Sequence, residues 1–65
     1  MSGGRHRGYT LRTSRGTGSY RSWERAVGAA RWTAEVTKAD TSIVNDDSGE
    51  TWDVKPDGRV SVHSI

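Results

Sequence analysis

Apolar and polar residues alternate through the C-terminal part of the chain, and the pattern predicts a tight β-hairpin there. Trp52 and Val54 precede a turn, and Val60 and Val62 follow it, each separated by one polar residue. Cross-strand partners share a face of a sheet, so all four apolar side chains reach one core if Val54 pairs with Val60. A three-residue loop at residues 56–58 gives this register, and its Pro-Asp-Gly sequence suits a type I turn followed by a left-handed glycine.

An amphipathic helix is predicted over about residues 23–39, with Ser22 as its N-cap. At about 100° per residue, one arc carries mainly small apolar residues that can cover a sheet closely, and the solvent side is charged. A second apolar cluster, on a flank of the helix, consists of Ala29, Trp32 and Val36. We expect a protein interface at this cluster. The alternative is that one end of the chain folds over it.

Residues 9–13 alternate apolar and polar side chains and are rich in β-formers, which predicts a first strand with Tyr9 and Leu11 facing the core. The following residues 14–19 combine two glycines with Ser, Thr and Arg, so we expect a mobile loop there. This loop would lead directly into the helix.

The β-branched run at residues 41–45 predicts a strand that pairs with the first strand of the hairpin. A three-residue loop between them would pair Val44 with Trp52, a four-residue loop would pair Ile43 with Trp52, and both registers stay open. The elements make a β-α-β-β-β chain of the α+β class, with one helix packed on one face of a small, mainly antiparallel sheet that ends in a β-meander. The helix is expected to cover Tyr9, Leu11, Trp52, Val54, Val60 and Val62, and the other sheet face to be polar.

The chain is short, with 65 residues and no cysteine, so one small core must form without disulfides or thiolate metal sites. We expect a flexible basic arm at residues 1–8 and a single domain at residues 9–65. No apolar run is long enough to cross a membrane or to act as a secretion signal. We therefore expect a soluble cytoplasmic protein, or a virion protein if a phage encodes it.

Charge is divided unevenly along the chain. The first 31 residues hold seven arginines against one glutamate, and the remaining residues hold three basic against seven acidic side chains, for a net charge of +2. Either the basic part meets a polyanion, or the two halves neutralise each other within the fold or between subunits.

The basic part carries the candidate nucleic-acid contacts. Guanidinium groups fork onto phosphates and stack on bases, and aromatic rings add stacking surfaces. Arginine composition alone could also produce such a pattern. The predicted contact residues are Arg5, Arg7, Arg12, Arg15, Arg21 and Tyr20.

Catalytic and metal-binding patterns are weak. The two histidines, His6 and His63, have no nucleophile motif or paired acid beside them. The glycines at residues 16–18 have half the form of a phosphate-binding loop, and a turn explains them better. The acidic residues 45–50 lack the calcium-loop pattern and suit a solvated hairpin tip. We expect no enzymatic activity, no cofactor and no metal.

The run Gly49-Glu50-Thr51-Trp52-Asp53-Val54-Lys55-Pro56-Asp57-Gly58-Arg59-Val60, together with the Ala- and Arg-rich helix and the opening Tyr9-Thr10-Leu11-Arg12 strand, resembles small uncharacterised proteins of actinobacteria and their phages. The resemblance covers about residues 9–62. It implies a fold and a genomic origin more than an activity.

Two functions follow as hypotheses. The first is a small accessory DNA- or RNA-binding protein, phage-related, whose arginines contact phosphates without strong sequence selectivity. The alternative is a non-enzymatic protein-interaction module that docks through Trp32 and Val36, either on a host or virion protein or as a homodimer.

Overall fold

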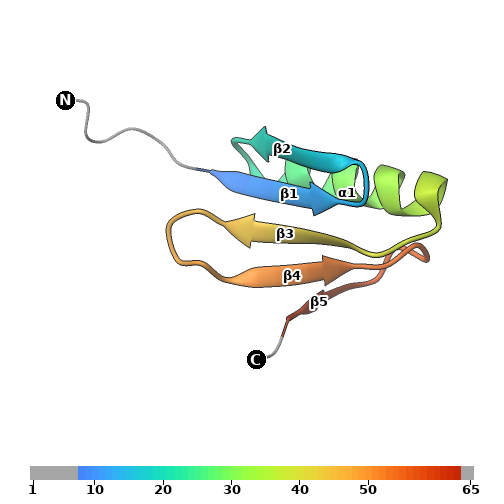
Figure 1. Cartoon of the computed structure of the whole chain (residues 1–65). Helices are drawn as coiled ribbons and strands as arrows, with labels where there is room; N and C mark the ends of the chain where they lie inside the picture. The colour runs from blue at the N-terminus through green and yellow to red at the C-terminus, as the bar shows by residue number, and fades with distance from the viewer. Residues whose placement is uncertain (1–7, 64–65) are drawn as a thin grey trace.

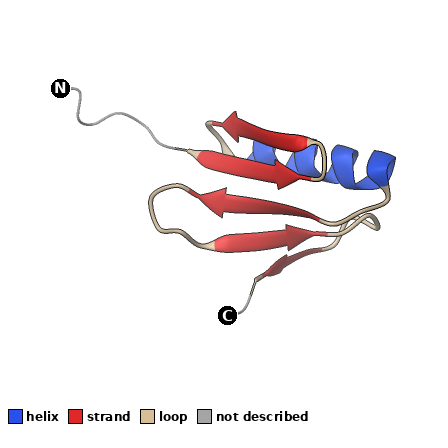
Figure 2. Cartoon of the chain, viewed as in Figure 1, coloured by secondary structure: helices blue, strands red, loops and turns tan. Residues whose placement is uncertain are grey.

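One helix lies across one face of a five-stranded antiparallel sheet in the computed structural model, which describes residues 8–63 (Figure 1). The strand order is β2-β1-β3-β4-β5, so β2 and β5 form the two edges. Figure 2 shows all the strands in one layer and the helix in a second layer behind them. The elements are β1 (Tyr9–Thr13), β2 (Gly16–Tyr20), α1 (Trp23–Thr37), β3 (Thr41–Asn45), β4 (Thr51–Val54) and β5 (Val60–Val62). The predicted α+β class is confirmed.

The prediction of a mobile loop at residues 14–19 is wrong, because most of this segment forms strand β2. A two-residue turn after Thr13 reverses the chain, and the Thr13 hydroxyl donates to the Gly16 carbonyl at 3.0 Å while accepting the Arg15 N–H at 3.0 Å. Gly16 has a φ of 132°, which a side chain would rarely permit. Glycine is a poor strand former, so pairing with β1 creates this strand against local propensity.

Helix α1 begins as predicted and ends two residues earlier. The Ser22 hydroxyl accepts the Arg25 N–H at 3.2 Å and caps the first turn. At the other end Lys38 adopts the left-handed conformation, with a φ of 59°, and its N–H donates to the Ala34 carbonyl. This left-handed residue stops the helix before Ala39.

The core lies between the alanine face of α1 and the middle of the sheet. Small side chains on the helix allow the close approach that the sequence predicts. The buried apolar residues are Leu11, Ala26, Ala30, Ala34, Ile43 and Val54. Val62 was expected in this core, but it is 60% exposed, because α1 lies over β1 to β4 and does not extend over β5.

Three aromatic rings close the core at the start of the helix. The Trp23 ring lies 5.6 Å from Tyr9 and 4.6 Å from Trp52, between centroids, at tilted angles. Such contacts add about 0.5–1.5 kcal/mol each beyond the area that they bury. The cluster fixes the N-terminal end of α1 over β1 and β4.

Both hairpins of the meander have defined registers. Val54 pairs with Val60 and Trp52 with Val62, as predicted, and Gly58 takes the left-handed position with a φ of 95°. The register between β3 and β4, for which two alternatives were open, is the one in which Ile43 pairs with Trp52 across a four-residue loop. This register turns Ile43 toward α1, which explains why it is fully buried.

Candidate functional site: a groove between α1 and the edge strand β2

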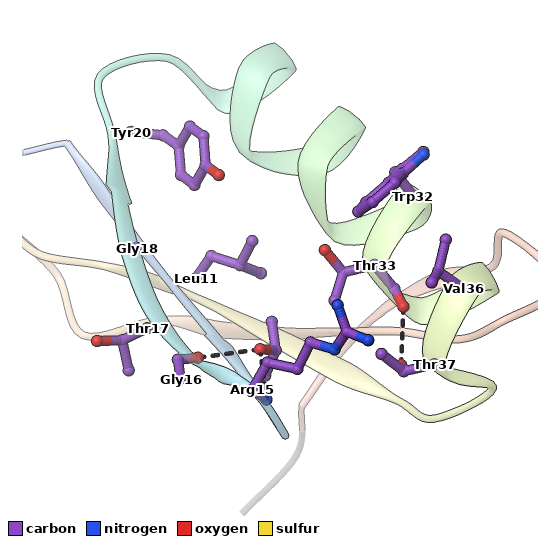
Figure 3. A pocket seen from close by; sticks show the side chains of 11 residues that line it. Leu11, Arg15, Gly16, Thr17, Gly18, Tyr20, Trp32, Thr33, Val36 and Thr37 are labelled. Atoms are coloured by element: carbon purple, nitrogen blue, oxygen red, sulfur yellow. Dashed lines mark hydrogen bonds between the residues drawn. The ribbon is translucent and has the colours of Figure 1, made fainter.

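A groove of about 220 Å³ runs between α1 and β2 (Figure 3). Leu11 lies at its base, Tyr20 lines it from the end of β2, and Trp32 and Val36 line it from the helix. The chain enters α1 directly after β2, so the helix runs back along this edge of the sheet. The groove therefore has one wall of helix and one of strand.

Glycines on the inner face of β2 leave the groove empty. Gly18 pairs with Leu11 across the strands, and paired residues share a face, so Gly18 and Gly16 both face the helix side. Neither has a side chain to fill the space under α1. A β-carbon at Gly18 would have the Tyr20 ring as its nearest neighbour, at 3.4 Å, and one at Gly16 would meet nothing within 4 Å. The glycines thus determine the depth of the groove.

The predicted flank cluster on α1 divides into two parts. Trp32 is 62% exposed and Val36 is 47% exposed, and both line the groove, where Figure 3 shows them on successive turns of the helix. Ala29 is half-buried and packs against the core. The expectation that large apolar side chains remain outside the core is confirmed for Trp32 and Val36. Their role as an interface stays a prediction.

Among the described residues that line the groove, Arg15 is the cation. Arg15 lies in the turn between β1 and β2, and Figure 3 shows its side chain extending toward α1. This places a guanidinium group at the end of the groove that lies beside Val36 and Thr37. An anionic group bound there would meet a planar donor suited to carboxylates.

The predicted nucleic-acid contacts do not gather on one face. Arg12 lies on the sheet face opposite the helix, Arg15 in the first turn, and Arg21 after β2 at the other end of that strand. Tyr20 is half-buried, packs against the core with part of its ring and lines the groove on the helix side. Arg5 and Arg7 lie outside the described residues. Nucleic-acid binding remains a prediction.

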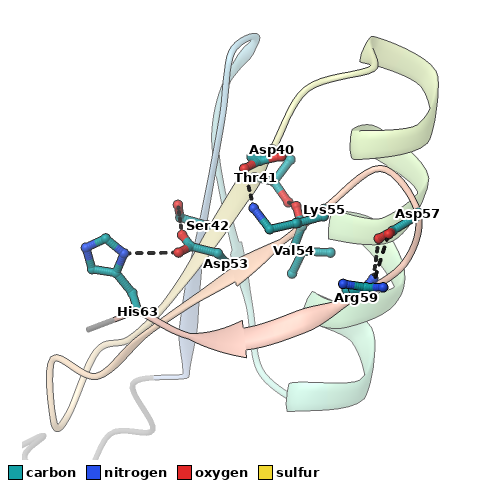
Figure 4. A network of polar contacts seen from close by, with 9 residues as sticks. All are labelled: Asp40, Thr41, Ser42, Asp53, Val54, Lys55, Asp57, Arg59 and His63. Carbon is teal, nitrogen blue, oxygen red and sulfur yellow. Dashed lines mark hydrogen bonds and ion pairs between the residues drawn. The ribbon is translucent and has the colours of Figure 1, made fainter. Parts of the chain in front are cut away.

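The open face of the sheet carries another cavity of about 280 Å³, lined by Arg12, Ser42, Val44, Thr51 and His63. In this lining the Ser42 hydroxyl donates to Asp53 at 3.4 Å, and the other carboxylate oxygen of Asp53 lies 3.0 Å from His63 Nδ1 (Figure 4). In nucleophilic catalysis the imidazole bridges the acid and the hydroxyl. Here Asp53 is the bridge, so this arrangement does not activate Ser42 as a nucleophile.

The uneven distribution of charge along the sequence separates a basic half of the molecule, with β1, β2 and α1, from an acidic half with β3, β4 and β5. The segment from Tyr9 to Lys38, which includes β1, β2 and α1, has six basic and two acidic side chains. Residues 39–63 have two basic and six acidic side chains. Within the acidic half, Lys55 pairs with Asp40 and Arg59 with Asp57, and the His63 ring contacts the Asp53 carboxylate (Figure 4). The groove belongs to the basic half.

Two further observations concern residues 8–63 as a whole. In this part of the chain no three His, Asp or Glu side chains gather closely enough to hold a metal ion. The single helix described there is too short and too polar to span a membrane.

The groove as a unit was not predicted, although its helical wall was. A signal for the other wall exists in the sequence, since Gly16, Gly18 and Tyr20 recur with the period of two that places them on one face of a strand. Alternation built from glycine carries no hydrophobic pattern, so the sequence alone predicts a loop there.

Comparison of the chain with protein-family models, with curated proteins and with solved structures finds no match. The resemblance to small actinobacterial and phage proteins therefore stays a prediction.

Proposed function

We propose that this protein is a non-enzymatic protein-interaction module whose docking site is the groove between α1 and β2. The observation that carries the proposal is the exposure of Trp32 and Val36 inside a groove, above a strand that has glycine at two of its three positions on that face. A tryptophan beside a preformed hollow is the usual centre of a binding hot spot. The partner would insert an apolar side chain between Trp32 and the Tyr20 ring, which lies over Gly18.

The groove supports this function better than the arginines support nucleic-acid binding. Phosphate recognition requires several cations along one path, whereas Arg12, Arg15 and Arg21 lie in three separate places. The groove, in contrast, brings together residues from β1, β2 and α1 on one surface. Burial of Trp32 and Val36 by a partner would remove apolar surface from water, which is the main driving force of association.

The proposal is tested by selecting binders from a displayed library of random peptides on the immobilised protein. Selected peptides should lose about tenfold or more in affinity for Trp32→Ala, since hot-spot residues contribute about 2 kcal/mol or more. The free energy of unfolding of Trp32→Ala should change by less than about 0.5 kcal/mol because the side chain is exposed. Calorimetric titration and urea unfolding measure the two quantities.

Val62→Ala is the matched control, because Val62 is as exposed as Trp32 but lies on the opposite edge strand. Its peptide affinities should equal those of the wild type. Light scattering of the wild type and of Trp32→Ala shows whether the partner is a second copy of the chain. A library that yields no peptide dependent on Trp32, together with a monomer in both proteins, rules the proposal out.

A further inference from the structure

The free edge of β2 indicates how a partner would bind, and the inference below rests on the proposed function. Successive residues of a strand bond alternately to the neighbour on either side. The Asp46 N–H donates to the Gly8 carbonyl at 3.0 Å, in line with the pairing of β1 and β3. The residues of β1 that bond to β2 are therefore the intervening ones, Tyr9, Leu11 and Thr13.

This alternation determines which backbone groups of β2 face outward. The partners of those three residues on β2 are Tyr20, Gly18 and Gly16. Thr17 and Ser19, which lie between them, turn their N–H and C=O groups away from β1 and out of the sheet. In the described part of the chain, no other strand lies on that side of β2. The edge is thus a template for one more strand.

The same register decides where the side chains of an added strand would go. A residue placed opposite Gly18 shares its face, so its side chain enters the groove beneath Trp32. A residue opposite Gly16 enters beside Val36. The residues between them would lie on the open face with the Thr17 and Ser19 side chains. In the sequence of the added strand, apolar and polar residues must therefore alternate.

The charge around the groove indicates which kind of segment can bind in it. The groove lies in the basic half of the molecule, and Arg15 lines one end. The first seven residues of the chain contain Arg5 and Arg7 and no acidic residue, so like charges oppose their binding in the groove. An acidic segment is attracted to it.

We propose that the groove takes an extended acidic peptide segment of a partner protein, which pairs with β2 as a sixth strand and places alternate apolar side chains into the groove from positions opposite Gly16 and Gly18. Main-chain hydrogen bonds to Thr17 and Ser19 supply the pairing, and the groove supplies side-chain selectivity. Arg15 pairs with a carboxylate of the segment and steers its approach.

The first test uses the peptides selected on the wild-type protein as probes and methylates their backbone nitrogens one at a time. In an added strand every second peptide N–H bonds to β2, so methylation should lower affinity by about tenfold or more at alternate positions and leave the intervening ones nearly unchanged. Loss without this alternation, or a helical bound peptide in nuclear magnetic resonance spectra, overturns strand addition.

The second test addresses charge with two reversals on the protein. Arg15→Glu should weaken the selected peptides by about tenfold, while Arg31→Glu, an equal change of charge at an exposed helix position that does not line the groove, should weaken them less. The binding should also weaken as salt is raised to physiological strength. Peptides without acidic residues, or equal effects of the two reversals, overturn the acidic specificity.

These outcomes separate the two proposals. If no selected peptide depends on Trp32 and the wild type and Trp32→Ala are both monomers, the proposed function fails and this inference fails with it. If peptides depend on Trp32 but show no alternate methylation effect, the docking function stands and strand addition is wrong. A wild-type dimer that Trp32→Ala dissociates identifies a second copy as the occupant and replaces the acidic partner.

Discussion

Glycine has two opposite roles in this chain, depending on its backbone angles. Gly58 has a φ of 95°, which closes the loop between β4 and β5 and would strain any residue with a β-carbon. Gly28 lies within α1, is exposed, and a β-carbon there would meet nothing within 4 Å. One glycine is required by its conformation, and the other only adds freedom to the unfolded chain.

Replacing each of these glycines by alanine should therefore change stability in opposite directions. Gly58→Ala should lower the free energy of unfolding by about 1–2 kcal/mol, the cost of a left-handed alanine. Gly28→Ala should raise it by about 0.5–1 kcal/mol, the difference in helix propensity. Urea unfolding followed by circular dichroism measures both, and a destabilised Gly28→Ala would show that the helix position is constrained.

At the scale of elements, the sequence predicts what is determined locally. The Trp52 to Val62 hairpin and the Ser22 cap depend on residues within a few positions of each other, and both are confirmed. Strand β2 depends on pairing with β1, which supplies hydrogen bonds that glycine propensity does not indicate. The register of Ile43 against Trp52 depends on a loop for which two lengths were possible. The groove wall formed by β2 was missed for the same reason as β2 itself.

The alanine face of α1 sets the distance between helix and sheet, and a larger side chain there should separate them. Ala30 is fully buried beneath the middle of the helix. Ala30→Leu should destabilise the protein by about 1–3 kcal/mol through overpacking. Arg31→Leu, at the next and exposed position, should change stability by less than about 0.5 kcal/mol. Equal urea midpoints for the two variants would contradict close packing at Ala30.

For the whole molecule, the central fact is the small size of the core. A chain of this length, without disulfides, rarely gains more than about 3–5 kcal/mol from one hydrophobic core. Ile43 is one of its largest fully buried side chains and lies on the central strand β3. The stability of the entire fold therefore depends strongly on this side chain.

Ile43→Ala should cost about 2–5 kcal/mol, which is comparable to the total stability, so a large fraction of the variant should be unfolded at room temperature. Val62→Ala, at an exposed position on β5, should remain folded. Dispersion of amide signals in nuclear magnetic resonance spectra distinguishes the two results. A well-folded Ile43→Ala protein would mean that the core tolerates a cavity at its centre.

The pairing of β1 with β3 has a consequence for how the chain folds. The other three strand pairs join neighbours in the sequence, whereas β1 and β3 are separated by β2 and the whole of α1. Hairpins form in about 1–10 μs, while contacts between distant segments must first overcome the entropy of closing a long loop. The β1–β2 hairpin and the β3–β4–β5 meander can thus form separately. We expect the pairing of β1 with β3 to be the step that limits the folding rate.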